Sequence, residues 1–359
     1  MRQSRLYIYP SPLDGTAHTA GNPPVEGDAP MRPSSISRVP ILLSTALALV
    51  LVAPSAVVAA PAATGYRLID LGTLGGESSY ATAMNDRGWV VGRSQVADGQ
   101  WHGFLWRRGR MTDLRPLSPS DINNRGQIVG LRDDLPGAHL WTAGRLVDLG
   151  TLGGDFTYPT AINDRGQVVG MSWTPDRPDA PFLWTRGVMR EVGLDTVSDV
   201  DNRGRVAGGR AAGSGGFHAS VWHRGTVTDL GAAAFDRSNS YRINDMGWVI
   251  GWTFSPERDE RGTLWRDGTM TDVGTLGGNR TRLVAINDRG AILAVSQTAE
   301  GAEHPARWHR GVLTDLTAAG IGPDDTMVDL NDRGEIAASV RPVWGVSHAV
   351  VYRPGTSPS

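Results

Sequence analysis

The chain contains no cysteine and no lysine, and each absence excludes a class of function. Without cysteine there can be no disulfide bond, no thiolate zinc site and no cysteine nucleophile. Lysine would be needed for a Schiff base or a phosphate-binding P-loop, and all 35 basic residues are arginine. G-x-S-x-G, H-E-x-x-H and EF-hand sequences are missing as well. The sequence therefore predicts no catalytic residues, no metal site and no cofactor.

The sequence also has no strong excess of charge of one sign, and its apolar residues do not recur at the spacing of a helix. The 35 basic residues are balanced by 37 acidic residues, so no strong field attracts a polyanion, and we expect no nucleic-acid partner. Apolar residues show no 3.6-residue period, which excludes a helical repeat protein. At 359 residues the chain has room for one large all-β domain or two ordinary domains.

One sequence pattern is repeated seven times. Its clearest copy is A-I-N-D-R-G-Q-V-V-G at residues 161–170. The first glycine of the copies lies at Gly88, Gly126, Gly166, Gly204, Gly247, Gly290 and Gly334. Consecutive glycines are 38 to 44 residues apart. A period of about 40 residues is typical of an array of one supersecondary unit.

Each copy predicts a tight β-hairpin. In the clearest copy, residues 161–163 and 167–169 are short β-rich runs, and the Asp-Arg-Gly sequence between them favours a turn. Asn163 and Asp164 recur in most of the other copies. A metal-binding or catalytic role would have to be repeated in every unit, so we interpret both as residues of an Asx-type turn.

Four short strands can be assigned to each unit. Strand a ends in A-I-N, strand b contains Q-V-V-G, strand c contains F-L-W and strand d contains M-T-D-L-G. Runs bounded by Gly, Asp and Asn about ten residues apart are typical of β-meanders. Strands b and c have apolar residues side by side, so both faces of the sheet must be covered. Blades stacked around an axis cover both faces, and we therefore predict an all-β, seven-bladed β-propeller of four-stranded blades.

The two ends of the repeat region predict that the ring is closed. The last unit has strands a, b and c, the last of them at residues 349–352, and no strand d after it. A strand-d sequence without a blade of its own lies at residues 66–72. We predict that this N-terminal strand completes the seventh blade, because an open array would expose two incomplete edges.

The first 62 residues carry no repeat. Residues 1–30 are rich in proline, glycine and polar residues, and predict a disordered or untranslated extension. Residues 31–62 contain two arginines followed by an apolar run at 41–60, which predicts a secretory signal peptide. A membrane anchor is the alternative, although Pro54 interrupts the run. The propeller would then comprise residues 63–359, either secreted or anchored to the cell envelope by an uncleaved N-terminal segment.

The units resemble those of the HAF-repeat family, bacterial proteins described as probable extracellular repeats. Three blocks carry the resemblance over about residues 66–353, in the fixed order D-L-G-T-L-G-G, A-I-N-D-R-G-Q-V-V-G and H-x-F-L-W-x-x-G. The H-A-F triplet itself is altered, for example to H-G-F at residues 102–104, and two units have lost it. The resemblance implies an extracellular repeat protein and no general biochemical activity. The period also fits WD40 repeats, but their Gly-His and Trp-Asp signatures are missing.

Residue types that often carry chemistry recur here in frame. Strand c has a histidine four residues before its aromatic residue in four units, at His102, His218, His304 and His348. Strand d has an acid in every unit, at Asp70, Asp113, Asp148, Glu191, Asp229, Asp272 and Asp315. Equivalent residues on different blades are too far apart to hold one metal ion. We interpret both sets, and the six in-frame tryptophans of strand c, as packing or hydrogen-bonding residues.

Function is expected where the units differ. The d-to-a and b-to-c connections emerge on the same face of a propeller, and they vary in this chain. They place polar residues after the T-L-G-G run and tryptophans beside charged residues, which suits ligand binding. The candidate ligand-binding residues are Glu77, Trp101, Asp155, Trp173, Trp252, Asn279 and Trp344.

Two hypotheses of function follow. The first is a secreted, monomeric, non-enzymatic protein that binds a protein or a carbohydrate through this variable face, without stable membrane insertion after signal cleavage. The second is an extracellular hydrolase or lyase that acts on glycans. In the second, a pair such as Glu77 and Asp155 would supply acid and base if the ring brought them within roughly 5 to 10 Å.

Overall fold

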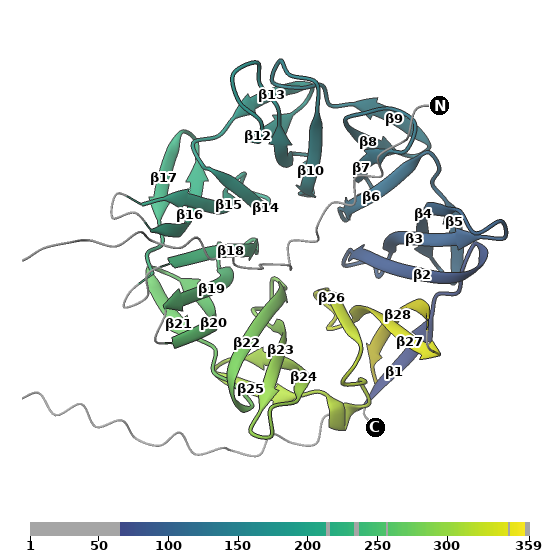
Figure 1. The fold of residues 1–359 in the computed structure, drawn as a ribbon, viewed down its shortest axis with the longest axis vertical. Helices are drawn as coiled ribbons and strands as arrows, with labels where there is room; N and C mark the ends of the chain where they lie inside the picture. The colour runs from purple at the N-terminus through teal and green to yellow at the C-terminus, as the bar shows by residue number, and fades with distance from the viewer. Residues whose placement is uncertain (1–64, 213–215, 233–236, 256–257, 344, 356–359) are drawn as a thin grey trace, which may run out of the picture. The chain divides into compact units, whose positions relative to one another are not determined.

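The protein is a seven-bladed β-propeller, as the repeats predict. A computed structural model describes residues 65–212, 216–232, 237–255, 258–343 and 345–355. Within them, seven four-stranded antiparallel sheets are arranged around an axis (Figure 1). No helix in these ranges has the length and apolar character needed to cross a bilayer. The predicted extension (1–30), the predicted signal peptide (31–62) and Trp344 lie outside the described residues.

The first four blades follow the chain in the order a, b, c, d. Blade 1 contains β2 (Gly75–Met84), β3 (Val90–Val96), β4 (Trp101–Arg107) and β5 (Arg110–Asp113). Blade 2 contains β6 (Leu117–Ile122), β7 (Ile128–Arg132), β8 (Ala138–Thr142) and β9 (Arg145–Asp148). Blade 3 contains β10 (Thr157–Ile162), β11 (Val168–Ser172), β12 (Ala180–Thr185) and β13 (Val188–Glu191). Blade 4 contains β14 (Thr196–Val200), β15 (Val206–Ala211), β16 (Phe217–His223) and β17 (Thr226–Asp229).

Blades 5 and 6 keep this order, and only blade 7 departs from it. Blade 5 contains β18 (Arg237–Ile243), β19 (Val249–Ser255), β20 (Arg258–Arg266) and β21 (Thr269–Asp272). Blade 6 contains β22 (Gly277–Ile286), β23 (Ile292–Thr298), β24 (Glu303–His309) and β25 (Val312–Asp315), and a short 3-10 helix, η1 (Thr317–Ala319), follows it. Blade 7 contains β26 (Thr326–Leu330), β27 (Ile336–Val343), β28 (Val346–Pro354) and, from the front of the chain, β1 (Tyr66–Asp70).

The N-terminal strand closes the ring. β1 pairs antiparallel with β28, with Leu68 opposite Tyr352 and Asp70 opposite Val350. The ladder continues one residue further, where the Leu71 N–H donates to the Ala349 carbonyl at 3.0 Å. The predicted closure is therefore confirmed, and the two ends of the repeat region lie side by side in the same blade (Figure 1).

The repeated turn is the predicted hairpin. In blade 3 the Asn163 N–H donates to the Gln167 carbonyl at 3.0 Å, and the Gly166 N–H donates to the Asn163 carbonyl at 2.9 Å. The Asn163 Oδ1 accepts the Arg165 N–H at 3.0 Å, which is the Asx-type bond that the sequence predicts. Gly166 has a φ of 74°, a left-handed conformation that glycine adopts without steric cost.

Apolar residues of strands b and c fill the spaces between blades, on both faces of each sheet. One of these clusters joins Leu71 and Val351 of the closing blade to Phe104 and Trp106 of blade 1. Of the strand-c tryptophans, those of blades 1, 3, 5 and 6 are buried, at Trp106, Trp184, Trp265 and Trp308. The interpretation of these rings as core residues is correct, because a large buried side chain contributes strongly to packing between blades.

Strand a begins earlier in two blades than the A-I-N run suggests, and this corrects the loop assignments. β2 and β22 begin at Gly75 and Gly277, so Glu77 and Asn279 lie on strands rather than in d-to-a loops. The T-L-G-G run makes a compact turn, in which the Thr73 hydroxyl donates to the Gly76 carbonyl at 2.7 Å. The chain can therefore enter the strand early. Trp252 likewise lies within β19 rather than in the b-to-c loop.

Candidate functional site

The a-to-b turns meet around the axis and form a ring of amide hydrogen bonds between blades. In six blades the side-chain nitrogen of an asparagine donates to the carbonyl of the equivalent residue in the next blade. The seventh blade has Asp201 at this position. Five bonds of this type lie between 2.6 and 3.0 Å, and the bond that closes the ring, from Asn331 to Asn85, is 3.3 Å. We call this set the amide ring: Asn85, Asn123, Asn163, Asp201, Asn244, Asn287 and Asn331. The sequence analysis assigned these residues to local turns and missed their role between blades.

The exception in the amide ring is Asp201, which has no side-chain donor. Its carboxylate is fully buried and forms an ion pair with Arg205, four residues later. The Arg205 guanidinium then reaches across to blade 5 and donates to the Asp245 carbonyl at 3.1 Å. This guanidinium therefore links blades 4 and 5 in place of the missing amide, at the carbonyl one residue beyond Asn244.

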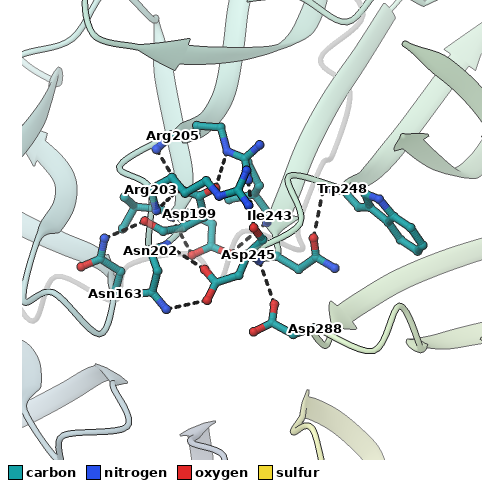
Figure 2. A network of polar contacts seen from close by, with 12 residues as sticks. Asn163, Asp199, Asn202, Arg203, Arg205, Ile243, Asp245, Trp248 and Asp288 are labelled. Atoms are coloured by element: carbon teal, nitrogen blue, oxygen red, sulfur yellow. Dashed lines mark hydrogen bonds and ion pairs between the residues drawn. The ribbon is translucent and has the colours of Figure 1, made fainter. Parts of the chain in front are cut away.

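The second turn residue forms another ring. In all seven blades its backbone N–H donates to the side-chain oxygen of its equivalent in the next blade, at 2.6 to 2.8 Å. We call this set the aspartate ring: Asp86, Asn124, Asp164, Asn202, Asp245, Asp288 and Asp332. Figure 2 shows the part of it around Asn202 and Asp245, whose carboxylate also accepts from the Asn202 amide at 2.6 Å.

Both rings border an axial cavity of about 190 Å³ that also contains charges found in only some blades. At the position before the last residue of strand a, three blades have alanine, three have Asp121, Asp199 and Asp329, and blade 5 has Arg242. Each aspartate accepts the N–H of its own chain neighbour and one from the next blade. For Asp199, the acceptor distances are 2.8 Å to Val200 and 3.0 Å to Ile243 (Figure 2).

Burial sets the ionisation of these groups. It raises the pKa of Asp121 to about 6 and that of Asp199 to about 7, although backbone N–H donors and Arg242 oppose the change. It also raises the pKa of Asp329. Burial acts to lower the pKa of Arg242, but the charges of Asp199, Asp329 and Asp121 outweigh it and the net shift is upward. In the aspartate ring, burial and the neighbouring carboxylates raise the pKa of Asp288 to about 6.

The axial groups join neighbouring blades. Their oxygens accept backbone N–H groups of neighbouring blades, which satisfies donors that would otherwise be costly to bury. In the described ranges no group of three or more acidic or histidine side chains is placed to hold a metal ion.

The buried aspartates predict that stability falls as pH rises. In the unfolded chain Asp121 and Asp199 titrate near 3.8, whereas in the folded protein they titrate near 6 and 7. Between these values the folded state keeps protons that the unfolded chain has lost, so the free energy of unfolding decreases with pH. We expect a higher urea midpoint at about pH 4.5 than at about pH 8. Asp199→Asn should reduce this difference, whereas Asp155→Asn, at an exposed position, should not. A midpoint that is equal at both pH values, or higher at pH 8, would contradict the prediction.

On the opposite face, the four recurring histidines pair with the strand-d acids of their own blades. The Nδ1 atoms of His102, His218, His304 and His348 lie 2.7 to 2.9 Å from a carboxylate oxygen of strand d. In blade 5 Arg261 takes the place of histidine and pairs with Asp272 at 2.9 Å. The other oxygen of the acid accepts a backbone N–H two residues later, as from Gly72 to Asp70 at 2.8 Å. These residues brace the start of the d-to-a connection, as their repetition predicts.

The same face carries an aromatic cluster in blade 1. Trp101, the first residue of β4, stacks on Tyr80 of β2 with ring centroids 5.1 Å apart and an angle of 29° between the planes. Tyr80 is 44% exposed, so the stacked pair presents a ring to solvent. Glu77 is exposed on the same strand, three residues before Tyr80. Blade 1 thus combines two of the predicted binding residues with a tyrosine that the sequence analysis did not select.

A second aromatic cluster lies in blade 3. Trp173 is 42% exposed and meets the edge of Phe156 with ring centroids 6.0 Å apart. Phe156 is in turn 6.1 Å from Tyr158, whose hydroxyl donates to Asp179 at 3.3 Å. The predicted Asp155 is exposed and directly precedes Phe156.

The remaining candidates are less closely grouped. Trp252 is half-buried inside β19, and Phe254 two residues later is 39% exposed. Asn279 is exposed on β22, and its carbonyl accepts a bond of 3.2 Å from Arg261. Glu77 and Asp155 belong to blades 1 and 3, with blade 2 between them, and no hydrogen bond or ion pair joins them in the described part of the chain.

The sequence analysis did not select Tyr80 and Tyr158, the aromatic residues of strand a in blades 1 and 3, although the sequence distinguishes these two blades from the others. Tyr80 and Tyr158 stand at the same register, four residues before Met84 and Ile162. They occur in blades that share the T-L-G-G run and an acid directly after it. Alignment of the seven units on strand a would have set these two blades apart.

One acid on this face is protected from solvent. A carboxylate oxygen of Glu260 on β20 is buried without a hydrogen-bond partner among the described residues. Burial raises the pKa of Glu260, against the lowering effect of Arg280, Arg282 and a hydrogen bond from Tyr241. Burial also raises the pKa of Tyr241, and the Glu260 charge adds to this.

Comparison with solved structures supports the fold. The chain is similar to a puromycin-hydrolyzing peptidase of Mycobacterium tuberculosis, with 12% identity and a TM-score of 0.50, over 77% of this chain and 49% of that one. It is also similar to YCF48 bound to D1 peptide, with 10% identity, a TM-score of 0.50, and coverage of 83% and 100%. The extracellular domain of the putative hybrid two component system BT3049 from B. thetaiotaomicron matches with 10% identity, a TM-score of 0.51, and coverage of 81% and 41%.

These similarities establish the fold and leave the activity open. The chain spans about half the length of the peptidase, and all three identities are far below the level at which function is shared. No family model and no curated protein matches the chain. The resemblance to the HAF-repeat family therefore rests on the three repeated blocks alone.

Proposed function

We propose that this chain is a secreted, monomeric member of the HAF-repeat family that binds a carbohydrate or protein partner without transforming it. The binding surface is the d-to-a and b-to-c face. The observation that carries the proposal is the pair of solvent-exposed aromatic clusters, Tyr80 with Trp101 and Phe156 with Trp173, each beside an exposed acid. The signal peptide predicted at residues 31–62 supports secretion.

Exposed tryptophan and tyrosine rings supply large contact areas at a small entropic cost. Glu77 lies three residues before Tyr80, Asp155 directly precedes Phe156, and both acids are exposed, so their oxygens can accept hydrogen bonds from hydroxyl groups of a ligand. This combination of an apolar ring and a polar acceptor favours a carbohydrate. A protein partner would use the same rings as hot spots, and the similar propeller YCF48 has been solved with a peptide.

The binding test uses two tryptophans and a matched control. Purified protein is screened on arrays of polysaccharides and peptides, and the affinity for the best partner is measured for Trp101→Ala and Trp173→Ala. Loss of a central aromatic contact costs about 2 kcal/mol or more, so each variant should bind at least about tenfold more weakly. Met246→Ala removes an exposed apolar side chain from the a-to-b turn on the other face and should bind as the unaltered protein does. Equal affinity of all four proteins would overturn the proposal.

The glycan-acting hydrolase or lyase remains the second candidate, and Glu260 is the observation that favours it. A carboxyl group whose pKa is raised by burial suits a general acid. The same screen separates the two candidates, because release of new chain ends from any glycan, abolished by Glu260→Gln, would replace binding with catalysis. Binding without release of chain ends supports the first.

A further inference from the structure

A cleft lined by arginines lies at the seam between blades 7 and 1, on the face of the a-to-b turns. Its volume is about 550 Å³. Its charged lining residues are Arg87, Arg108, Arg333 and Arg353, together with Asp86 and Glu335. We call it the arginine cleft. It is on the opposite face from the aromatic clusters, so it is independent of the proposed function.

The acids of the arginine cleft are already occupied. Glu335 is nearly buried and accepts Arg333 at 2.7 Å and Arg353 at 2.8 Å. Asp86 belongs to the aspartate ring, where it accepts the Asp332 N–H at 2.8 Å. These bonds leave little capacity on either carboxylate for further cations.

Two further guanidinium groups have no acidic partner. Arg87 lies over the ring of Trp89, 5.5 Å from its centroid, and this contact holds the side chain at the cleft without neutralising its charge. Arg108 is exposed at the c-to-d turn of blade 1. Among the described residues neither arginine forms an ion pair. Four arginines against two acids give the lining a formal charge of +2.

We propose that the arginine cleft binds a doubly charged oxyanion, a phosphate or sulfate group, carried by a partner molecule. Guanidinium groups offer paired N–H donors that match the oxygens of such groups. Charge-assisted bonds of this kind would satisfy Arg87 and Arg108 together, at a seam that Glu335 and the aspartate ring already hold in place. Glycine at position 88 lets the Arg333 guanidinium pack directly against the turn, because a Cβ there would lie only 2.5 Å from it.

The test measures thermal stability and affinity with inorganic phosphate and inorganic sulfate, against sodium chloride at the same ionic strength. Both oxyanions should raise the melting temperature above the chloride value, because a ligand that binds only the folded state stabilises it. Calorimetric titration then gives the affinities. A partner that carries phosphate predicts tighter binding of phosphate, and a sulfated partner predicts tighter binding of sulfate. No stabilisation beyond that of chloride would overturn the proposal.

Three variants separate the cleft from general charge effects. Arg87→Gln and Arg108→Asn should each weaken oxyanion binding about tenfold, since hydrogen bonds to charged groups are among the stronger ones. Asparagine is chosen because Arg108 has a φ of 52°, which asparagine tolerates. The control, Arg110→Gln, removes an exposed arginine of the same hairpin that does not line the cleft. Equal losses in Arg110→Gln would overturn the proposal, and if Arg108→Asn does not fold, Arg87→Gln decides alone.

Discussion

A chain that begins at Thr73 should fail to form a stable monomeric ring. It lacks β1, and with it the ladder to β28 and the buried side chain of Leu71. Burial of one leucine contributes roughly 2 kcal/mol and each ladder hydrogen bond about 1 kcal/mol, so the loss exceeds about 5 kcal/mol. We expect the melting temperature to fall by about 10 °C or more. The bared edge of β28, which includes Val351 and Tyr352, should then promote association.

The matched control is a chain that begins at Gly65 and keeps the whole of β1. It should melt as the full chain does and remain monomeric by size-exclusion chromatography with light scattering. Adding a synthetic peptide of residues 65–72 to the truncated chain should restore the monomer, because the pairing of this strand with β28 is noncovalent. A truncated chain that stays monomeric with unchanged melting would show that closure by β1 contributes little.

Arg205→Ala should be among the most destabilising single substitutions in the ring. It leaves the fully buried carboxylate of Asp201 without its cation and removes the bond to the Asp245 carbonyl. Loss of one partner from a buried ion pair costs about 3 to 5 kcal/mol. Urea unfolding should therefore show a much lower midpoint. Arg203→Ala, an exposed position in the same turn, should change the free energy of unfolding by less than about 0.5 kcal/mol.

A double substitution provides the rescue. Asp201→Asn with Arg205→Gln reproduces the pair found in blade 3, where the Asn163 amide donates to Gln167 at 2.8 Å and to the carbonyl of the next blade at 2.6 Å. The double variant should recover most of the lost stability, because it supplies a neutral donor in place of the buried ion pair. If Arg205→Ala is no more harmful than Arg203→Ala, the guanidinium does not complete the amide ring.

The repeats were sufficient to predict the number of blades, the four strands in each and the closure by β1. Each of these depends on local patterns, such as the turn at Asn163 and the paired apolar residues of strands b and c, which have the same meaning in every unit. Boundaries were less predictable. Glu77, Asn279 and Trp252 lie on strands because the chain resumes pairing earlier, or continues it longer, than their composition suggests.

The candidate site was predicted only in part. Trp101 and Trp173 were selected from their sequence context, and their exposure and aromatic partners could not be read from it. Tyr80 and Tyr158 were missed because an aromatic residue in strand a is equally consistent with a core position. Only the packing between strands shows which aromatic rings face solvent.

The sequence by itself determined the architecture of this protein, because a hairpin turn and an alternating strand require only neighbouring residues. The tertiary structure decided everything that joins one blade to the next. Asn163 is a turn residue in the sequence, and it becomes a link between blades only when the ring places the Asp201 carbonyl beside its amide. Likewise, Arg87 and Arg353 meet at one cleft only because closure brings blade 7 against blade 1. Such contacts join residues that are distant in the chain, and no local pattern records them.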